Sequence, residues 1–385
     1  MILTINGGSS SIKFALYKTG KHLAKVFSGR IDMIGSGDIT FKLNGPGDQI
    51  PCKVKGYDSD IACLTGLLAQ NVNVAELKAI GHRVVQGMQH TAPCLITTEL
   101  LKELKKFIPY DPDHLPTEIK LIEALQARYP DTMQFVCFDT GFHQTMPEVA
   151  KLLSIPRRFT RQGISRYGFH GLSYQYLMGE LGDIAGKKAA KGRVILAHLG
   201  SGASLCAVYK GKSIDTTMGF TPAGGIPMSS RSGDLDPGVA WIMMKTEKLS
   251  PKQFNHIINH ESGLLGISET TGDMGELLAQ EHGDNRSAAA IEMFCYQVKK
   301  WIGTFSAALG GVDMLVFSGG IGENAPVIRT RICEGLGFLG IKLHEKRNHK
   351  NASLISQNKG SVSVYVIPTN EEIIIAELVN KMIHT

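Results

Sequence analysis

The segment Met1–Lys18, MILTINGGSSSIKFALYK, decides the fold. Two apolar runs, Met1–Ile5 and Ile12–Tyr17, flank a glycine- and serine-rich turn at Asn6–Ser11. Short apolar runs interrupted by Gly and Ser are typical of a strand, a tight turn and a second strand. The segment therefore predicts a β-hairpin.

A second copy of this hairpin is present at Val194–Lys210, VILAHLGSGASLCAVYK. The two copies align without a gap at an offset of 200 − 8 = 192, half of the 385-residue chain. The identical pairs are Gly8/Gly200, Ser9/Ser201, Ala15/Ala207, Tyr17/Tyr209 and Lys18/Lys210. Coincidence over one hairpin is the alternative, but a repeat at half-length favours two similar α/β halves with a ligand cleft between them.

Composition agrees with two ordinary globular domains. A chain of 385 residues exceeds the usual size of one hydrophobic core, and 43% hydrophobic with 20% charged residues is unremarkable for a globular protein. The net charge of 41 − 35 = +6 has no single basic run behind it. Solvated helix faces explain it better than a nucleic-acid site, and it suits small anionic substrates equally well.

The cysteines indicate a reducing compartment. They are scattered and form no CxxC pair, which favours reduced thiols in a cytoplasmic protein over a disulfide frame or a zinc site. No signal peptide or membrane span is recognisable. The seven cysteines are Cys52, Cys63, Cys94, Cys137, Cys206, Cys295 and Cys333.

Periodicity predicts helices and strands that alternate along the chain, as in mixed, partly parallel sheets. Thr369-x-x-Glu372 predicts a capping box at the start of the last helix. The expected helices are His114–Arg128, Tyr174–Ile184, Ser287–Leu309 and Glu371–Ile383, and the expected strands include Phe135–Phe138 and Met314–Phe317.

Glycine and serine turns and two arginines are candidates for binding anions. The turns Asn6–Ser11 and Gly200–Ala203 offer backbone N–H groups and hydroxyls to a polyphosphate, although plain hairpins are the alternative. Arg231 lies in the polar run Gly219–Pro237, and Arg83 ends a strand-like run. A guanidinium binds carboxylate or phosphate with two parallel hydrogen bonds; a structural salt bridge is the alternative for each arginine.

His170 and Asp139 are the remaining candidates. His170 stands between glycines at the expected entrance of a helix, so we expect few side chains around it, although a structural histidine is the alternative. Asp139 follows a strand directly and is expected to face a metal or a reacting group; a turn-capping role is the alternative.

These residues carry a resemblance to the acetate kinase family, within the superfamily of actin, sugar kinases and the large heat-shock ATPases. The resemblance extends over nearly the whole chain. The matching runs are Asn6–Lys13, Gly81–Val85, Phe138–Pro147, Tyr167–Gly171, His198–Ala203, Gly219–Pro222, Arg231–Pro237, Gly319–Pro326 and Thr369–Glu372.

The resemblance implies an α/β fold of two similar ribonuclease-H-like (actin-like ATPase) domains, with mixed sheets flanked by helices and the active site in the cleft between them. The implied domains are residues 1–142 plus 372–385, and residues 143–371. The implied activity is reversible, Mg²⁺-dependent phosphoryl transfer from ATP to acetate by direct in-line attack, in a cytoplasmic homodimer, with Mn²⁺ as a substitute metal. Propionate or butyrate kinase activity is the alternative, and a non-catalytic nucleotide-binding homologue is a further one.

The resemblance also assigns roles to single residues. The implied catalytic residues are Arg83, His114, Asp139, His170 and Arg231. The substrate is implied to contact Arg83, Val85, Phe169 and Pro222. The implied ATP-binding residues are Ser9, Ser11, Lys13, His198, Ser201, Gly202, Asp273, Met274, Gly320, Ile321 and Asn324. The implied metal residues are Asn6 and Glu371.

The sequence departs from the family pattern in both binding regions. Ser201 replaces the usual Asn, and Gly275 replaces an arginine expected to contact the nucleoside. Near the substrate, Gln86–His90 replaces a His-Gly-Gly-rich turn, and Ala223–Pro227 is also unusual. We expect these departures to affect nucleotide preference and the size of the substrate pocket.

Overall fold

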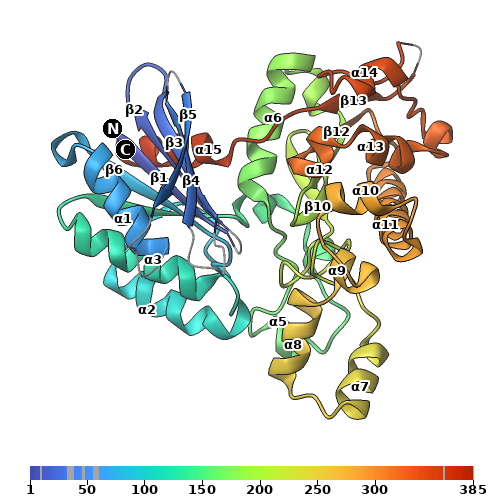
Figure 1. Cartoon of the computed structure of the whole chain (residues 1–385), viewed down its shortest axis with the longest axis horizontal. Coiled ribbons are helices and arrows are strands. Elements are labelled where there is room, and N and C mark those ends of the chain that lie inside the picture. The colour runs from blue at the N-terminus through green and yellow to red at the C-terminus, as the bar shows by residue number, and fades with distance from the viewer. Residues whose placement is uncertain (9–10, 33–38, 46–47, 55–59, 359, 385) are drawn as a thin grey trace. The chain divides into compact units, whose positions relative to one another are not determined.

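The computed structural model describes residues 1–8, 11–32, 39–45, 48–54, 60–358 and 360–384. The chain divides into two compact units, of which unit 1 comprises Met1–Gly141 and Asn370–Thr385 and unit 2 comprises Phe142–Thr369. In Figure 1 the red C-terminal helix α15 (Glu371–Met382) lies beside the blue strands of unit 1. From the resemblance we expected the first segment of unit 1 to end at residue 142, and it ends at 141. We expected its second segment to begin at residue 372, and it begins at 370.

The strands of unit 1 form one mixed sheet in the order β5-β4-β3-β2-β1-β6-β8-β7. Neighbours β1, β6 and β8 are parallel, so their carboxyl ends meet at one edge, whereas the remaining pairs are antiparallel. The strands are β1 (Ile2–Gly7), β2 (Ser11–Lys18), β3 (Ala24–Asp32), β4 (Ile39–Gly45), β5 (Asp48–Val54), β6 (Ala79–Val84), β7 (Cys94–Leu95) and β8 (Met133–Phe138).

Helices cover both faces of this sheet. Leu3 of β1 packs with Leu64 of α1 and Leu121 of α3 on one face. On the other face α15 lies against β6, where a Cβ built on Gly81 would come within 2.6 Å of Ile375. Glycine is needed there because a larger residue would push the helix off the sheet. The remaining elements are α1 (Asp60–Asn71), η1 (Val74–Glu76), α2 (Thr98–Phe107), η2 (Ile108–Tyr110) and α3 (Leu115–Arg128).

Unit 2 is built on a smaller mixed sheet in the order β11-β10-β9-β12-β13. Tyr174 and Leu177 of α6 pack against strand residues such as Leu196, while α11 contacts β9, β10 and β11. The strands are β9 (Arg193–Leu199), β10 (Ala203–Tyr209), β11 (Lys212–Thr216), β12 (Met314–Ser318) and β13 (Ser363–Val366). The longer helices are α6 (Gly171–Ala185), α7 (Pro237–Thr246), α8 (Pro251–His260), α11 (Asn285–Leu309) and α13 (Pro326–Cys333). The short elements are η3 (Gly141–Thr145), α4 (Glu148–Lys151), α5 (Arg157–Thr160), η4 (Ala189–Lys191), α9 (Gly263–Ser268), α10 (Met274–Gln280), α12 (Gly319–Asn324), η5 (Leu336–Leu339) and α14 (Glu345–His349).

The two sheets share one strand pattern. In unit 1, β3-β2-β1-β6-β8 run antiparallel, antiparallel, parallel and parallel to their neighbours, and β11-β10-β9-β12-β13 of unit 2 repeat that pattern. The prediction of two α/β halves with mixed sheets is confirmed.

The predicted ungapped match of the two hairpins does not hold across the turn. Four residues separate the last paired residues Gly7 and Ile12, whereas three separate Leu199 and Ala203. A shift of one residue turns a strand's side chains to the opposite face. By strand pairing Tyr209 therefore corresponds to Lys18, and both are exposed at the ends of their strands, whereas Tyr17 is buried.

The four predicted helices are present as α3, α6, α11 and α15, with ends shifted by up to three residues. The predicted capping box is wrong. The N-cap of α15 is Asn370, whose side chain accepts a hydrogen bond from the Ile373 amide, while the Glu372 carboxylate accepts one from Asn6. Asn at the N-cap satisfies the helix as well as Thr does, which frees both predicted partners for other contacts.

Six of the cysteines have free thiols, as expected for reduced residues, and all but Cys94 are buried. Burial raises the pKa of the Cys295 and Cys333 thiols to about 12. The side chain of Cys52 lies outside the described residues. Every described helix is too short or too polar to span a lipid bilayer.

Candidate active site

Asn6, Arg83 and Asp139 meet where the parallel strands β1, β6 and β8 end; we call them edge group 1. The Arg83 guanidinium donates through Nη2 to Asp139 Oδ2 at 2.9 Å and through Nη1 to Asn6 Oδ1 at 3.3 Å. The Asp139 side chain is fully buried and that of Arg83 is 11% exposed. Burial alone lowers the pKa of Arg83, but Asp139 and Glu371 outweigh it and raise the pKa above its usual range.

Helix α15 brings two carboxylates to edge group 1. The Asn6 amide donates to Glu371 Oε2 at 2.8 Å and to Glu372 Oε1 at 3.1 Å. Lys13 pairs with Asn6 across β2 and β1, so the two side chains point to the same face of the sheet. The structure therefore brings the predicted metal residues Asn6 and Glu371 together, with Arg83 and Asp139 beside them.

His114 is buried immediately before α3, where its Nδ1 bonds to Asp111 Oδ1 at 2.8 Å. One turn further along α3, Glu118 is also buried, and both of its carboxylate oxygens accept from the Val85 amide, at 3.1 and 3.2 Å. Burial and the nearby Asp111 raise the pKa of Glu118, while Arg83 opposes that rise. Sequence reasoning missed Glu118; its spacing of four residues from His114 on one helix was the available signal.

A matching set lies at the strand ends of unit 2, which we call edge group 2: His198, Ser318 and Thr369. His198 Nδ1 bonds to Ser173 Oγ at 2.8 Å, and that oxygen lies 2.8 Å from Thr369 Oγ1. Glu323 Oε1 accepts hydrogen bonds from the Gly319 amide at 2.8 Å and the Thr369 amide at 3.2 Å. Edge group 2 is therefore held by hydroxyls, an imidazole, backbone amides and the Glu323 carboxylate.

His170 stands at the entrance of α6 with a left-handed backbone, φ 58°. Its Nδ1 bonds to Ser204 Oγ at 2.8 Å, and its ring stacks on His198 with centroids 4.3 Å apart. The expectation of few surrounding side chains is wrong, because the neighbours come from β9 and β10 and not from the flanking residues.

Arg231 lies close to the second Gly/Ser turn. A Cβ built on Gly202 would lie 3.4 Å from His170 Nε2 and 3.9 Å from Arg231 Nη1, so these two predicted residues converge on one glycine. Arg231 Nη1 also lies 3.5 Å from the Pro222 carbonyl oxygen. In unit 2 the predicted Phe169 and Pro222 are both buried, as is Val85 in unit 1.

The predicted nucleotide residues are divided between the units. Ser11 and Lys13 belong to unit 1, and Ser9 lies outside the described residues. In unit 2, α12 carries Gly320, Ile321 and Asn324, while Asp273 caps α10 by accepting from the Gly275 and Glu276 amides. Ser201 is exposed in its turn, and Met274 is buried at the start of α10.

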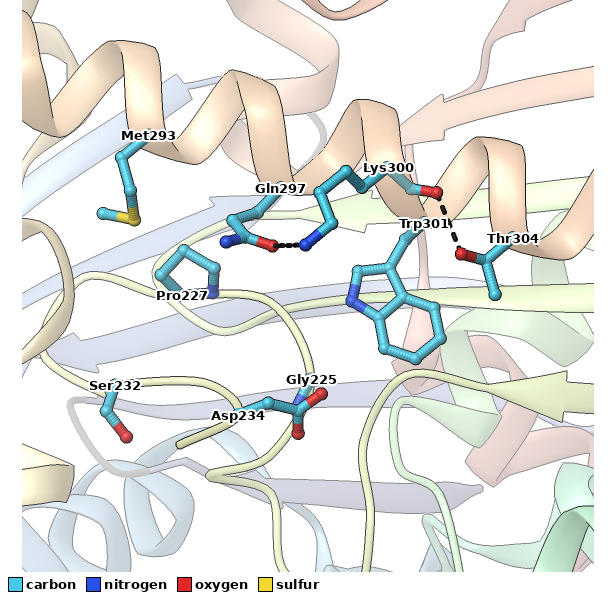
Figure 2. Close-up of a pocket in the computed structure, with 9 residues that line it drawn as sticks. All are labelled: Gly225, Pro227, Ser232, Asp234, Met293, Gln297, Lys300, Trp301 and Thr304. Carbon is cyan, nitrogen blue, oxygen red and sulfur yellow. Dashed lines mark hydrogen bonds between the residues drawn. The ribbon is translucent and has the colours of Figure 1, made fainter. Parts of the chain in front are cut away.

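A cavity of about 470 Å³ lies in unit 2 beside the segment 225–234, which carries Arg231. Figure 2 shows Gln297, Lys300 and Trp301 of α11 on one wall, with Pro227 and Asp234 opposite. Hydrogen bonds between Asp234 and Gly225 close the segment into a loop. The cavity therefore borders the Arg231 loop without containing Arg231.

Comparison with known proteins decides the family. The model of the Acetokinase family matches residues 1–377. The chain belongs to the acetokinase family. Acetate kinase from Rhodopseudomonas palustris is 42% identical over 388 residues, covering 98% of this chain and 96% of that protein. Membership makes the chain a phosphotransferase with a carboxyl group as acceptor.

Solved structures of acetokinase relatives extend this result to the fold. Acetate kinase from Porphyromonas gingivalis is 34% identical with a TM-score of 0.86, covering 100% of this chain and 99% of that one. A propionate kinase from Francisella tularensis is 35% identical with a TM-score of 0.90, covering 98% of each chain. The resemblance proposed from the sequence is thereby confirmed.

One departure from the acetokinase pattern has a visible geometry. Gly275 is the second residue of α10, and a Cβ there would lie 3.1 Å from the capping Asp273 Oδ1. A side chain at this position fits only if the Asp273 carboxylate, which caps α10, moves by a few tenths of an ångström.

Proposed function

We propose that the chain transfers the γ-phosphoryl group of ATP to acetate, reversibly, giving acetyl phosphate and ADP. The observation that supports this most strongly is edge group 1, a nearly buried guanidinium among carboxylate and amide oxygens at one strand edge. A guanidinium is suited to a small carboxylate or a phosphoryl group. Apolar Val85 and Phe169 suit an alkyl end better than a sugar.

No catalytic base is needed for this reaction. A carboxylic acid with a pKa near that of the side-chain carboxyls, about 4, is already ionised at pH 7. The chain must instead hold two anions together and neutralise the charge of an in-line phosphoryl transition state. We assign Arg83 to the carboxylate and phosphoryl oxygens, Arg231 and His170 to the transferring group, and His114 and Asp139 to supporting electrostatics near Arg83.

Asn6 and Glu371 are the proposed metal residues. Their oxygens fit Mg²⁺, with Mn²⁺ as a substitute, because Mg²⁺ keeps several waters and uses one or two protein carboxylates plus substrate phosphates. When bound, the ion neutralises charge on the phosphate oxygens. Asn6 and Glu371 would hold it, and Asp139 belongs to the same edge group as Asn6.

We assign ATP to the turns and helix starts of unit 2, at His198, Ser201, Gly202, Gly320, Ile321 and Asn324, with Asp273 and Met274, and to Ser9, Ser11 and Lys13 of unit 1. Small residues and backbone amides at such turns bind polyphosphates without side-chain crowding. The missing side chain at Gly275 weakens the contact with the nucleoside.

Acyl-phosphate formation tests the proposal. Purified protein, Mg-ATP and acetate, propionate or butyrate are incubated in parallel, and the product is trapped with hydroxylamine as the hydroxamate. We expect magnesium-dependent turnover with acetate. Propionate is the second candidate because a solved neighbour is a propionate kinase, and one methylene changes discrimination by only about 1–3 kcal/mol. Absence of turnover with all three acids and either ATP or GTP contradicts the proposal.

Arg231→Leu tests the site directly. Loss of an electrostatic donor of this kind costs on the order of 10² in kcat, roughly 3 kcal/mol. The matched control is Arg286→Leu in the same unit, where an exposed arginine pairs with Glu269 and Asp284. We expect the control to retain wild-type kcat; an Arg231→Leu variant that does the same would exclude Arg231 from the chemistry.

We also propose a cytoplasmic homodimer. Free buried thiols suit a reducing compartment. Helix α7 is apolar but contains no buried residue, and its Trp241 side chain is 65% exposed. An apolar helix with so much exposed area favours a contact with a second copy. Light scattering coupled to gel filtration should give twice the monomer mass for the wild type and a lower mass for Trp241→Glu.

A further inference from the structure

Glu118 is a buried acid that the proposed reaction does not use. It lies in the first turn of α3 with 3% of its surface exposed. Both carboxylate oxygens accept from the backbone amide of Val85, the residue that directly follows β6. A buried carboxylate is costly unless it is paired, so its presence calls for a reason.

The contact joins α3 to the chain segment that carries the substrate residues. Arg83 is the penultimate residue of β6, and Val85 begins the turn after it. The Val85 amide lies one residue beyond the last ladder pair of β6 and β8, Val84 and Phe138, and it donates to Glu118. Glu118 therefore holds the first residue beyond the strand ladder, which ends at Val84, and the turn's own hydrogen bonds begin only at Gln86.

Charges around Glu118 link it to the same segment. Arg83 attracts the carboxylate, whereas Asp111 and Asp139 repel it, and Asp111 is itself bonded to His114. Glu118 is thus placed where its loss alters both the Val85 turn and the electrostatic surroundings of Arg83.

We propose that Glu118 is a positioning residue for the carboxylate substrate, which fixes Val85 and Arg83 in the geometry that receives the acid. This inference rests on the proposed function. It predicts that Glu118 affects the carboxylate far more than it affects ATP, because the contact is confined to the end of β6. A residue needed only for folding would lower the melting temperature without separating the two substrates.

Three variants and one control test the proposal. Glu118→Leu removes both acceptor oxygens at similar volume, Glu118→Gln keeps one acceptor, and Glu118→Asp keeps the carboxyl group on a shorter side chain. Glu123→Leu is the matched control, because Glu123 lies on the same helix, is 45% exposed and pairs with Lys105. KM for acetate, KM for ATP, kcat and Tm are measured for each.

For Glu118→Leu we expect the KM for acetate to rise by roughly tenfold or more, since small displacements of positioning groups have effects of this size or larger. The KM for ATP should stay within about twofold, as should all parameters of the control. Glu118→Gln should restore most of the acetate affinity, because an amide oxygen still accepts the Val85 N–H. Equal changes in both KM values, or an unchanged KM for acetate, would overturn the proposal.

The outcome stays decisive if Glu118→Leu does not fold. Glu118→Asp then carries the test, with a raised KM for acetate at near wild-type Tm supporting the proposal and an unchanged KM overturning it. Failure of the proposed function is distinguishable, since a wild-type protein without acyl-phosphate formation overturns both ideas. Wild-type turnover with unaltered variants overturns only the role of Glu118.

Discussion

At the carboxyl ends of their parallel strands, the two sheets carry different chemistry at matching positions. Strand pairing sets Ile5 beside His82 in unit 1 and Ala197 beside Phe317 in unit 2, so Asn6 corresponds to His198 and Arg83 to Ser318. Val136 pairs with His82 and Val366 pairs with Phe317, so these two valines also correspond. The third residue beyond each valine is Asp139 in unit 1 and Thr369 in unit 2. Edge group 1 and edge group 2 thus occupy the same three places on one strand pattern.

The difference shows how one backbone arrangement serves two kinds of anion. Edge group 1 pairs a guanidinium with buried carboxylates, and such charges are stable only together. Edge group 2 uses hydroxyls and an imidazole, with Glu323 accepting backbone amides. We infer that unit 1 supplies charge compensation to the reacting groups, and unit 2 supplies neutral donors to a polyphosphate.

Arg83→Leu is the change with the largest expected effect. Removing the arginine leaves Asp139 buried without its cation, which costs about 3–5 kcal/mol of unfolding free energy. Activity should fall by at least about 10² in kcat. Urea unfolding and the hydroxamate assay measure the two effects.

Ser318→Ala is the matched control in unit 2. Its Oγ makes only a long bond of 3.4 Å to Glu323, so we expect a loss of about 0.5 kcal/mol or less. Equal losses of unfolding free energy for Arg83→Leu and Ser318→Ala would show that the chemical difference between the edge groups does not affect stability.

The pair His82 and Phe317 predicts an acid sensitivity at this place in the sheet of unit 1. Burial lowers the pKa of His82 to about 4 from 6.5, against the opposing hydrogen bond to Gln134. Because the pKa of His82 is lower in the folded than in the unfolded chain, the neutral ring favours folding fully above pH 6.5. About 3 kcal/mol of unfolding free energy is lost as the pH falls from 6.5 through 4. The double variant His82→Phe with Gln134→Leu makes this place apolar, as Phe317 does in unit 2. Between pH 7 and 4.5 its free energy of unfolding should fall by less than that of the wild type. Identical urea-unfolding losses in variant and wild type would exclude His82 as the cause.

Thr369→Val is expected to have a small effect, because it removes one edge-group hydrogen bond between hydroxyls. It removes the bond to Ser173, which keeps its partner His198, so the unfolding free energy should fall by only about 1 kcal/mol. Asp139→Asn at the matching place should cost more, because Arg83 loses its countercharge. Reversal of this order in urea unfolding would contradict the division between charged and neutral edges.

Much of the candidate site was predictable from local sequence. Arg83 ends a strand-like run, Asp139 follows one, and His170 precedes a helix, and each stands there in the structure. Glu118 was not predictable, because a glutamate in a helix is usually exposed and only the packing of α3 onto β6 buries it. The stacking of His170 on His198 likewise joins residues distant in sequence.

Local sequence signals gave the family, the two α/β halves, the two hairpins and the four helices α3, α6, α11 and α15, because turns, apolar periodicity and motif residues are local. Only the tertiary structure decided the one-residue register difference between the hairpins, the cap at Asn370 and the partners of Arg83 and Glu118. These depend on which strands become neighbours and how far a helix is buried, and both are set by packing between residues far apart in the chain.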